Sequence, residues 1–317
     1  MGGEHPRMGT HVHFSIDAER TPAGKMSIQR INRLLLREDF RRWPIRALAR
    51  RLIWRLRWLS AGDRWQLRLA NGMDISAPRC GAGALIYYQG CTEPETARFI
   101  ERFLKPGMTF FDVGAHIGEY ALLGSQRVGP AGAVHAFEPQ PDTCDVLRGN
   151  VAQNRLTNVI VHCLAVGASD CRVDFDVCME PSHSSIHSGS GGSDERAVLR
   201  TISVPQRTLD SYCAAQGACP QLIKVDVEGA EASVLQGARA LLAKSPQESP
   251  VWVLEYAPEN YARLGHTLTE VIKLLRSHRY GLQELDPDGD AVPVSPSACK
   301  WDHAVNLVAS KRSLKSG

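Results

Sequence analysis

The chain has 317 residues, of which 43% are hydrophobic and 22% are charged, values typical of a soluble globular protein. It has no apolar run of about 18 residues, which argues against a membrane-spanning helix. Its polar first 21 residues lack the apolar segment of a secretory signal. The nine cysteines form no Cys-x-x-Cys pair, so we expect reduced thiols in a cytoplasmic protein, and neither a disulfide framework nor a zinc site.

The net charge of +3 is unevenly distributed. Residues 20–59 hold twelve Lys and Arg and two acids, a net charge of +10, which leaves −7 for the rest of the chain. We expect residues 1–28 to be disordered, because they are polar and show no hydrophobic period.

Residues 44–59 predict a basic amphipathic helix. Its apolar side chains recur at helical spacing, with arginines between them: Ile45, Leu48, Leu52, Leu56 and Leu59. We favour packing of this apolar stripe on the body of the protein, with solvated arginines. The alternative is peripheral contact of residues 44–59 with an anionic membrane surface, or with an acidic partner.

Strands and helices alternate in the remainder of the chain. A hairpin is predicted over 65–76 around Asn71-Gly72, and a helix over 93–104 that ends at Lys105-Pro106-Gly107. The predicted strands that follow are 108–113, 133–138, 159–164, 222–227 and 251–255. Their alternation with helices predicts a parallel sheet with right-handed crossovers.

Further strands are predicted at 171–177 and 200–205, and a final pair at 280–285 and 304–309, joined through the turn at 286–289. The loop at 180–196 is rich in Ser, Gly and His and is either a lid over a substrate or a flexible insertion. Its His183 and His187 have an i,i+4 spacing, but the Ser and Gly around them do not favour a helix, so we expect no metal.

The strongest local motif is FFDVGAHIG at 110–118, a buried strand that turns into a helix. Glycines let the backbone approach a ligand closely, and the helix N-terminus offers free N–H groups to an anion. The next strand ends at Glu138, 24 residues after Gly114, where a carboxylate can accept both hydroxyls of a ribose.

These features fit a site for either a nicotinamide or an S-adenosylmethionine cofactor. The Gly114-x-x-x-Gly118 spacing differs from the Gly-x-Gly-x-x-Gly of dinucleotide sites and favours S-adenosylmethionine. Asp112, just before the turn, suits a sulfonium and an ammonium group, whereas it would repel a pyrophosphate.

A series of motifs covers about residues 85–310. In chain order they are DVGAHIG (112–118), AFEP (136–139), NVAQN (150–154), TLD (208–210), LIKVDVEGAE (222–231), VLQGA (234–238) and VLE (253–255). Their order resembles that of the FkbM-type family of S-adenosylmethionine-dependent methyltransferases.

This resemblance implies a class I methyltransferase fold at 80–312: an α/β, doubly wound, Rossmann-like domain whose seven-stranded, mostly parallel sheet has its last strand reversed. Residues 1–79 would be a partly disordered extension with a basic helix. The family transfers methyl groups to hydroxyls of polyketides or sugars without a metal.

The resemblance also assigns cofactor-binding residues. Asp112, Gly114 and Gly118 would line the methionine end, Glu138 would hold the ribose, and Ala165 and Val166 would flank the adenine. The family usually has Asn at the position of His116. We keep His116 among the cofactor-binding residues, and a histidine there could instead reach the substrate.

Charged residues in a central strand predict the catalytic group. Lys224 and Asp226 alternate on one face of an otherwise apolar strand, where charges are costly unless they are paired or functional. We predict that Asp226 takes the proton of the acceptor hydroxyl and that Lys224 anchors it, with Glu228 and Glu255 as the next candidates. These acids could instead cap a helix or form ion pairs, and Glu231 suits a first helical turn.

The sequence therefore predicts an O-methyltransferase that acts on a small molecule, a glycan or a polyketide-like acceptor. One alternative is a partner protein that binds the cofactor without catalysis. Another is a nucleic-acid methyltransferase that uses the Arg-rich arm. We do not expect nucleic acid, because the catalytic part has a net negative charge and lacks an Asn-Pro-Pro-Tyr-like motif.

Overall fold

The computed structural model describes residues 40, 43–57, 64–178, 184–187, 198–294, 301 and 303–314. The chain forms two compact units, Met1–Ala49 and Arg50–Gly317. The disorder expected for residues 1–28 lies outside the described residues, as does most of the loop at 180–196, including His183.

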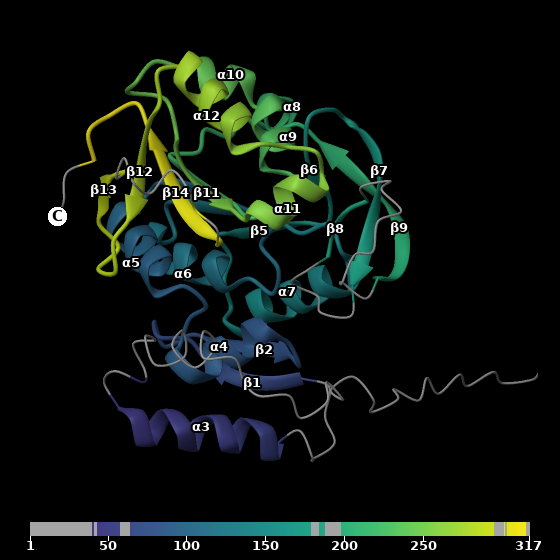
Figure 1. Ribbon diagram of the computed structural model, residues 1–317, viewed down its shortest axis with the longest axis vertical. Helices are drawn as coiled ribbons and strands as arrows, with labels where there is room; N and C mark the ends of the chain where they lie inside the picture. Colours follow the sequence, from purple (N-terminus) through teal and green to yellow (C-terminus); the bar gives the residue numbers. More distant parts are fainter. Residues whose placement is uncertain are drawn as a thin grey trace, which may run out of the picture. The chain divides into compact units, whose positions relative to one another are not determined.

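The second unit is built on an eight-stranded sheet of order β13-β12-β14-β11-β10-β3-β4-β5 (Figure 1). The strands are β3 (Thr109–Val113), β4 (Ala133–Phe137), β5 (Val159–His162), β10 (Leu222–Val225), β11 (Val251–Tyr256), β12 (Gly281–Leu285), β13 (Ala291–Pro293) and β14 (Val305–Ser310). Strands β5, β4, β3, β10 and β11 pair in parallel, and β14 is antiparallel to both β11 and β12. This is the expected doubly wound sheet with a reversed last strand.

The edge strand β13 corrects the expected strand count and one expected connection. We predicted seven strands, with the turn at 286–289 leading to the strand at 304–309. The turn instead leads to β13, which pairs with β12. The reason is local: the carboxylate of Asp286 accepts the N–H groups of Asp288 (3.0 Å) and Asp290 (2.7 Å), which closes a tight turn onto the adjacent residues.

Helices cover both faces of the sheet (Figure 1). In chain order they are α4 (Gly81–Gln89), α5 (Pro94–Phe103), α6 (Glu119–Val128), α7 (Pro141–Gln153), α8 (Leu209–Gln216), α9 (Glu231–Gln236), α10 (Arg239–Ala243), α11 (Pro258–Arg263) and α12 (Leu268–Ser277). Neighbouring strand residues belong to different cores: Phe110 and Leu222 lie in one, and Phe111 and Ile223 lie in the other. Burial on both faces explains why these strands are continuous apolar runs.

A smaller sheet is inserted between β5 and α8. Its order is β6 (Ala165–Val166), β9 (Val198–Arg207), β7 (Cys171–Cys178) and β8 (Ser185–Ile186). The long strands β7 and β9 are antiparallel and correspond to the strands predicted at 171–177 and 200–205.

The predicted hairpin is present as β1 (Arg64–Arg68) and β2 (Asp74–Pro78). The side chain of Asn150 in α7 accepts the N–H of Ser76 at 2.7 Å and donates to its carbonyl at 3.1 Å. The hairpin thus packs against α7 of the second unit. The expected division into an extension (1–79) and a methyltransferase domain (80–312) stays a prediction.

Helix α3 (Pro44–Arg57) turns a different face to the body than we expected. Trp54 is buried, while Leu52 and Leu56 are 59% and 54% exposed, so the expected packing of the apolar stripe is wrong. The ring of Trp54 lies 4.7 Å from that of Trp65, and this aromatic contact sets which side of the helix faces inward. Among the described residues, no helix has both the length and the apolar character needed to cross a bilayer.

A disulfide joins Cys144 in α7 to Cys163, just after β5, with their Cα atoms 5.9 Å apart. The expectation of reduced thiols is therefore wrong for this pair. Spacing along the sequence could not reveal it, because the contact depends on how the start of α7 returns past the end of the neighbouring strand.

Candidate active site

A cavity of about 360 Å³ opens at the carboxyl ends of the central strands. Residues 113–117 after β3, Glu138 after β4 and residues 226–228 after β10 form its walls. Open α/β sheets place their ligands at this edge, where successive strand ends meet.

The glycine turn after β3 fits tightly against the loop after β10. Gly114 has a φ of +81°, and a Cβ there would overlap the backbone carbonyl of Asp226. The N–H groups of Gly114 and Ala115 both donate to the carbonyl of Phe137, at 3.0 and 2.9 Å. The turn thus requires glycine, and it holds the ends of β3, β4 and β10 together.

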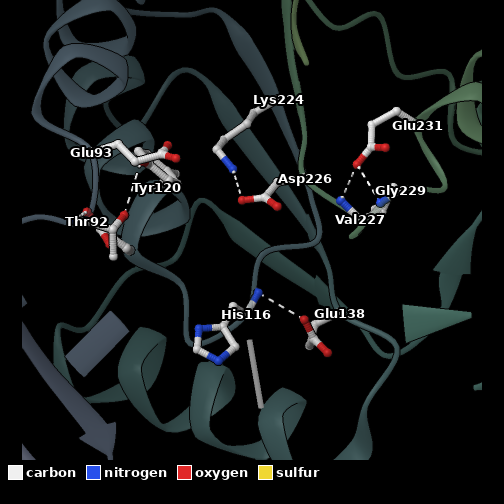
Figure 2. A network of polar contacts seen from close by, with 11 residues as sticks. Thr92, Glu93, His116, Tyr120, Glu138, Lys224, Asp226, Val227, Gly229 and Glu231 are labelled. Atoms are coloured by element: carbon white, nitrogen blue, oxygen red, sulfur yellow. Dashed lines mark hydrogen bonds and ion pairs between the residues drawn. The ribbon is translucent and has the colours of Figure 1, made fainter. Parts of the chain in front are cut away.

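Glu138 is a buried carboxyl group on the cavity wall. It accepts the backbone N–H of His116 at 3.0 Å (Figure 2) and that of Gln140 at 2.9 Å. Burial raises its pKa to about 7, although both hydrogen bonds oppose this shift. The two bonds orient the carboxyl group, and each oxygen keeps a second lone pair for a ligand.

The other predicted cofactor residues are partly on this wall. His116, Ala165 and Val166 line the cavity, whereas Asp112 and Gly118 are not among the lining residues. Asp112 is fully buried on β3, in register with Lys224 on β10. Burial raises its pKa to about 6, and the Lys224 ammonium opposes the shift. Contact of Asp112 with the cofactor stays a prediction.

His116 adopts a positive φ of 48°, a left-handed conformation that is uncommon in residues other than glycine. Burial lowers the pKa of His116 to about 4, so its imidazole is neutral at pH 7. Its Nε2 has no hydrogen-bond partner among the described residues. A ligand in the cavity could supply that partner.

Lys224 and Asp226 form a buried ion pair in the cavity (Figure 2), with 2.8 Å between Nζ and Oδ2. Burial disfavours the ammonium form of Lys224, but Asp226, Glu93 and Asp112 outweigh it and raise the pKa. Burial likewise raises the pKa of Asp226, but the Lys224 charge and hydrogen bonds from Lys224 and Glu255 bring it below its ordinary value. Both groups are therefore ionised at neutral pH.

Glu255, near the end of β11, also lines the cavity. The negative charge of Asp226, and then burial, raise the pKa of Glu255 well above its ordinary value. The raised pKa favours the protonated form of Glu255, which can donate a hydrogen bond to the Asp226 carboxylate. A protonated Glu255 is a poor candidate for the base.

Glu228 and Glu231 shape the loop after β10. Glu228 has a φ of 56°, and its carboxylate accepts a hydrogen bond of 2.6 Å from Asn260. Glu231 is buried in the first turn of α9 and accepts the N–H groups of Val227 (3.0 Å) and Gly229 (3.3 Å). Glu228 lines the cavity and Glu231 does not, which gives Glu231 the structural role that its position suggested.

The cavity also contains acidic residues that sequence reasoning missed. Tyr120 donates to the carboxylate of Glu93 at 2.9 Å (Figure 2), and the Lys224 ammonium lies 4.5 Å from the centre of the Tyr120 ring. Glu119 accepts the N–H of Thr92 at 2.8 Å. The sequence carries no signal for Glu93, which occupies the N-cap position of α5 without making a side-chain capping bond.

Oxygen atoms of Asp226, Glu228 and Glu255 lie within 4.8 Å of one another, a spacing that could hold a metal ion. The Lys224 ammonium already contacts Asp226 from one side. The expectation of metal-free chemistry stays a prediction.

The smaller sheet supplies another wall of the cavity. Phe175 of β7, with Ser184 and Ile186 at β8, lines it. His187 instead pairs with Asp176 at 2.8 Å. Part of the predicted lid segment therefore reaches the cavity, while the histidine at its described end does not.

A family model described as the methyltransferase FkbM domain matches residues 112–282. The chain is 35% identical over 98 residues to the 31-O-demethyl-FK506 methyltransferase FkbM of Streptomyces tacrolimicus (31% of this chain, 36% of that protein). It is 30% identical over 146 residues to the hexuronic acid methyltransferase AglP of Haloferax volcanii (46% of this chain, 56% of that protein). The matches thus span about a third to a half of these relatives.

Solved structures with a similar fold include methyltransferase FkbM from Methylobacillus flagellatus KT, at 17% identity and a TM-score of 0.41, covering 72% of this chain and 52% of that one. A SAM-dependent O-methyltransferase from Thermotoga maritima has 15% identity and a TM-score of 0.39, covering 81% of this chain and 80% of that one.

Proposed function

The chain belongs to the FkbM methyltransferase family, and from this premise we propose that it transfers a methyl group from S-adenosylmethionine to a hydroxyl oxygen of a small molecule, a glycan or a polyketide-like acceptor. The observation that carries the proposal is a single cavity lined both by the glycine turn after β3 and by the buried Lys224–Asp226 pair. The printed names of two relatives, one acting on demethyl-FK506 and one on a hexuronic acid, support acceptors of these classes.

The cavity suits the cofactor of this family. The oriented carboxyl of Glu138 would accept hydrogen bonds from the ribose hydroxyls, and Ala165 and Val166 would flank the adenine. Because Gly114 has no Cβ, the turn at 114–116 fits against the Asp226 carbonyl, and this turn would lie at the methionine end of the cofactor. When bound, S-adenosylmethionine supplies an electrophilic methyl group.

Activation of the acceptor falls to Asp226 in this proposal. An alcohol is a weak nucleophile, and removal of its proton as the new bond forms increases its reactivity. Asp226 is ionised and can take that proton, while the Lys224 ammonium and the protonated Glu255 hold its carboxylate in place. Because the pKa of Asp226 is low, the proton moves late, and alignment of the acceptor contributes most of the rate.

The first experiment separates enzyme from binder. Calorimetry with S-adenosylmethionine and with NAD is expected to show binding of the first alone. Incubation with methyl-labelled S-adenosylmethionine and a small-molecule extract is expected to yield a labelled product that loses no label under conditions that cleave esters. Cofactor binding without transfer of the labelled methyl group to any component of the extract would favour a partner protein that binds the cofactor without catalysis.

The second experiment tests Asp226. Replacing it by Asn keeps the size and removes the base, so turnover is expected to fall by about 10²-fold or more, with cofactor affinity nearly unchanged. Asp145→Asn is the matched control, because the side chain of Asp145 is 70% exposed and pairs with Arg148 in the same helix. Equal turnover in the two variants would remove Asp226 from the mechanism.

A further inference from the structure

Helix α3 is held to the body by aromatic and cationic side chains. Trp54 stacks on Tyr87 with 5.4 Å between ring centres. The guanidinium of Arg51 lies 4.4 Å from the centre of the Tyr88 ring, and Arg50 donates to the carbonyl of Tyr88 at 3.0 Å. These contacts fix the rotation of the helix about its own axis.

That rotation turns the leucines outward. Leu52, Ile53 and Leu56 are 59%, 46% and 54% exposed. At about 100° per residue, the sequence places Ile45 and Leu48 on the same arc, which spans about 140° and contains no charged residue. Large side chains that are apolar and exposed in a continuous stripe are uncommon on a protein surface and mark an interaction site.

The polar residues at the edges of this arc are all basic. The 14 residues of α3 include five arginines and no acid, and residues 20–59 together carry a net charge of +10. On the helical wheel, Arg55 borders the arc on one side and Arg46 and Arg57 border it on the other. The helix thus presents an apolar stripe with one arginine on one side and two on the other.

We propose that this exposed face of α3, the leucine face (Leu52, Ile53 and Leu56 with the residues in helical register), binds the surface of an anionic membrane. The leucines enter the boundary of the acyl chains, and Arg46 and Arg55 at the edges extend to the lipid phosphates, whereas the guanidinium of Arg57 lies 4.6 Å from the centre of the Trp65 ring. The charge pattern favours this occupant over a second copy of the chain, since two such helices would bring like charges together without an acid between them. Each arginine adds attraction to an anionic surface.

Vesicle co-sedimentation with the full chain tests the proposal. Vesicles of phosphatidylcholine with about one third phosphatidylglycerol are expected to bind the protein, and pure phosphatidylcholine is expected to bind it at least about tenfold more weakly. Added salt is expected to weaken binding to the anionic vesicles.

Variants locate the contact on the leucine face. Leu52→Ser and Leu56→Ser are each expected to weaken vesicle binding about tenfold, and Arg55→Gln about fivefold. Leu199→Ser is the matched control, since Leu199 on β9 has the same 59% exposure as Leu52, and it is expected to leave binding unchanged. Circular dichroism and cofactor calorimetry report folding, which surface substitutions should preserve.

The proposal is overturned if the wild-type chain does not bind anionic vesicles or binds both vesicle types equally. It is also overturned if the variant with both leucines replaced binds anionic vesicles with unchanged affinity. Analytical sedimentation without lipid tests whether a second copy of the chain binds the leucine face instead. A dimer that the double variant Leu52→Ser/Leu56→Ser converts to a monomer would make the face a contact between copies of the chain and would also overturn the membrane assignment.

Discussion

Replacement of Lys224 by Met tests the electrostatics of the site most directly. The side chain of Lys224 is 1% exposed, and its ammonium lies 2.8 Å from the carboxylate of Asp226. Met fills a similar volume without the charge. Asp226 would then be an ionised group in a cavity that also contains the carboxyl groups of Glu255 and Glu93.

The expected loss of stability follows from this geometry. Removing one partner of a buried ion pair costs about 3–5 kcal/mol of unfolding free energy. Because the side chain of Asp226 is 29% exposed, water offsets part of this cost, and we expect a loss of about 3 kcal/mol near pH 8.

The loss should depend on pH in a defined direction. In the wild-type chain the pKa of Asp226 is depressed. The ionised carboxylate therefore stabilises the fold at pH values above its unfolded-state pKa of about 3.9, and this stabilisation is lost as the pH falls through its folded-state pKa. Without Lys224, burial and neighbouring carboxyl groups raise the pKa of Asp226 above the unfolded value. As the pH falls, Asp226 of the variant is protonated and no longer carries an unpaired buried charge. The difference in unfolding free energy between the variant and the wild-type chain therefore becomes smaller from pH 8 to pH 5.

Urea unfolding of both chains at several pH values, followed by tryptophan fluorescence, measures this difference. Lys273→Met is the matched control: Lys273 lies exposed on α12, and its replacement is expected to change stability by less than about 0.5 kcal/mol. A deficit that is equal at pH 5 and pH 8, or no deficit at all, would refute the assigned pair.

Three further results are expected. Gly114→Ala should abolish cofactor binding in calorimetry, because a Cβ overlaps the Asp226 carbonyl; wild-type affinity would contradict the tight turn. Cys144→Ser should lower the unfolding free energy by about 3 kcal/mol without reductant, since the disulfide joins residues 19 positions apart. With dithiothreitol the loss should be much smaller, and equal losses under the two conditions would argue against the disulfide. EDTA should leave methyl transfer unchanged, because Lys224 supplies the positive charge beside Asp226; inhibition reversed by Mg²⁺ would place a cation among Asp226, Glu228 and Glu255.

The central strands could be predicted within a few residues because each is a short apolar run that ends at a glycine or an acid. The orientation of α3 could not. Its period shows that one face is apolar, but which face turns inward depends on an aromatic cluster formed by Trp54, Trp65 and Tyr87, residues that belong to three different elements. The edge strand β13 was missed because three residues carry too little periodicity.

At the site, Gly114, Glu138, Lys224 and Asp226 could be placed together from the sequence because parallel strands bring their carboxyl ends to one edge. Glu93 could not, since it precedes α5 and reaches the cavity only through the packing of that helix against the body. The protonation of Glu255 also depends on a through-space partner, Asp226 on another strand.

The position of β14 has a consequence for how the sheet is completed during synthesis. The ribosome makes β11 and β12 before β14, yet β14 lies between them. Until residues 305–310 have been made, both earlier strands expose unpaired backbone groups to neighbouring nascent chains. The nascent chain therefore depends on a late segment to close its sheet, and chaperones that shield strand edges should matter most during that interval.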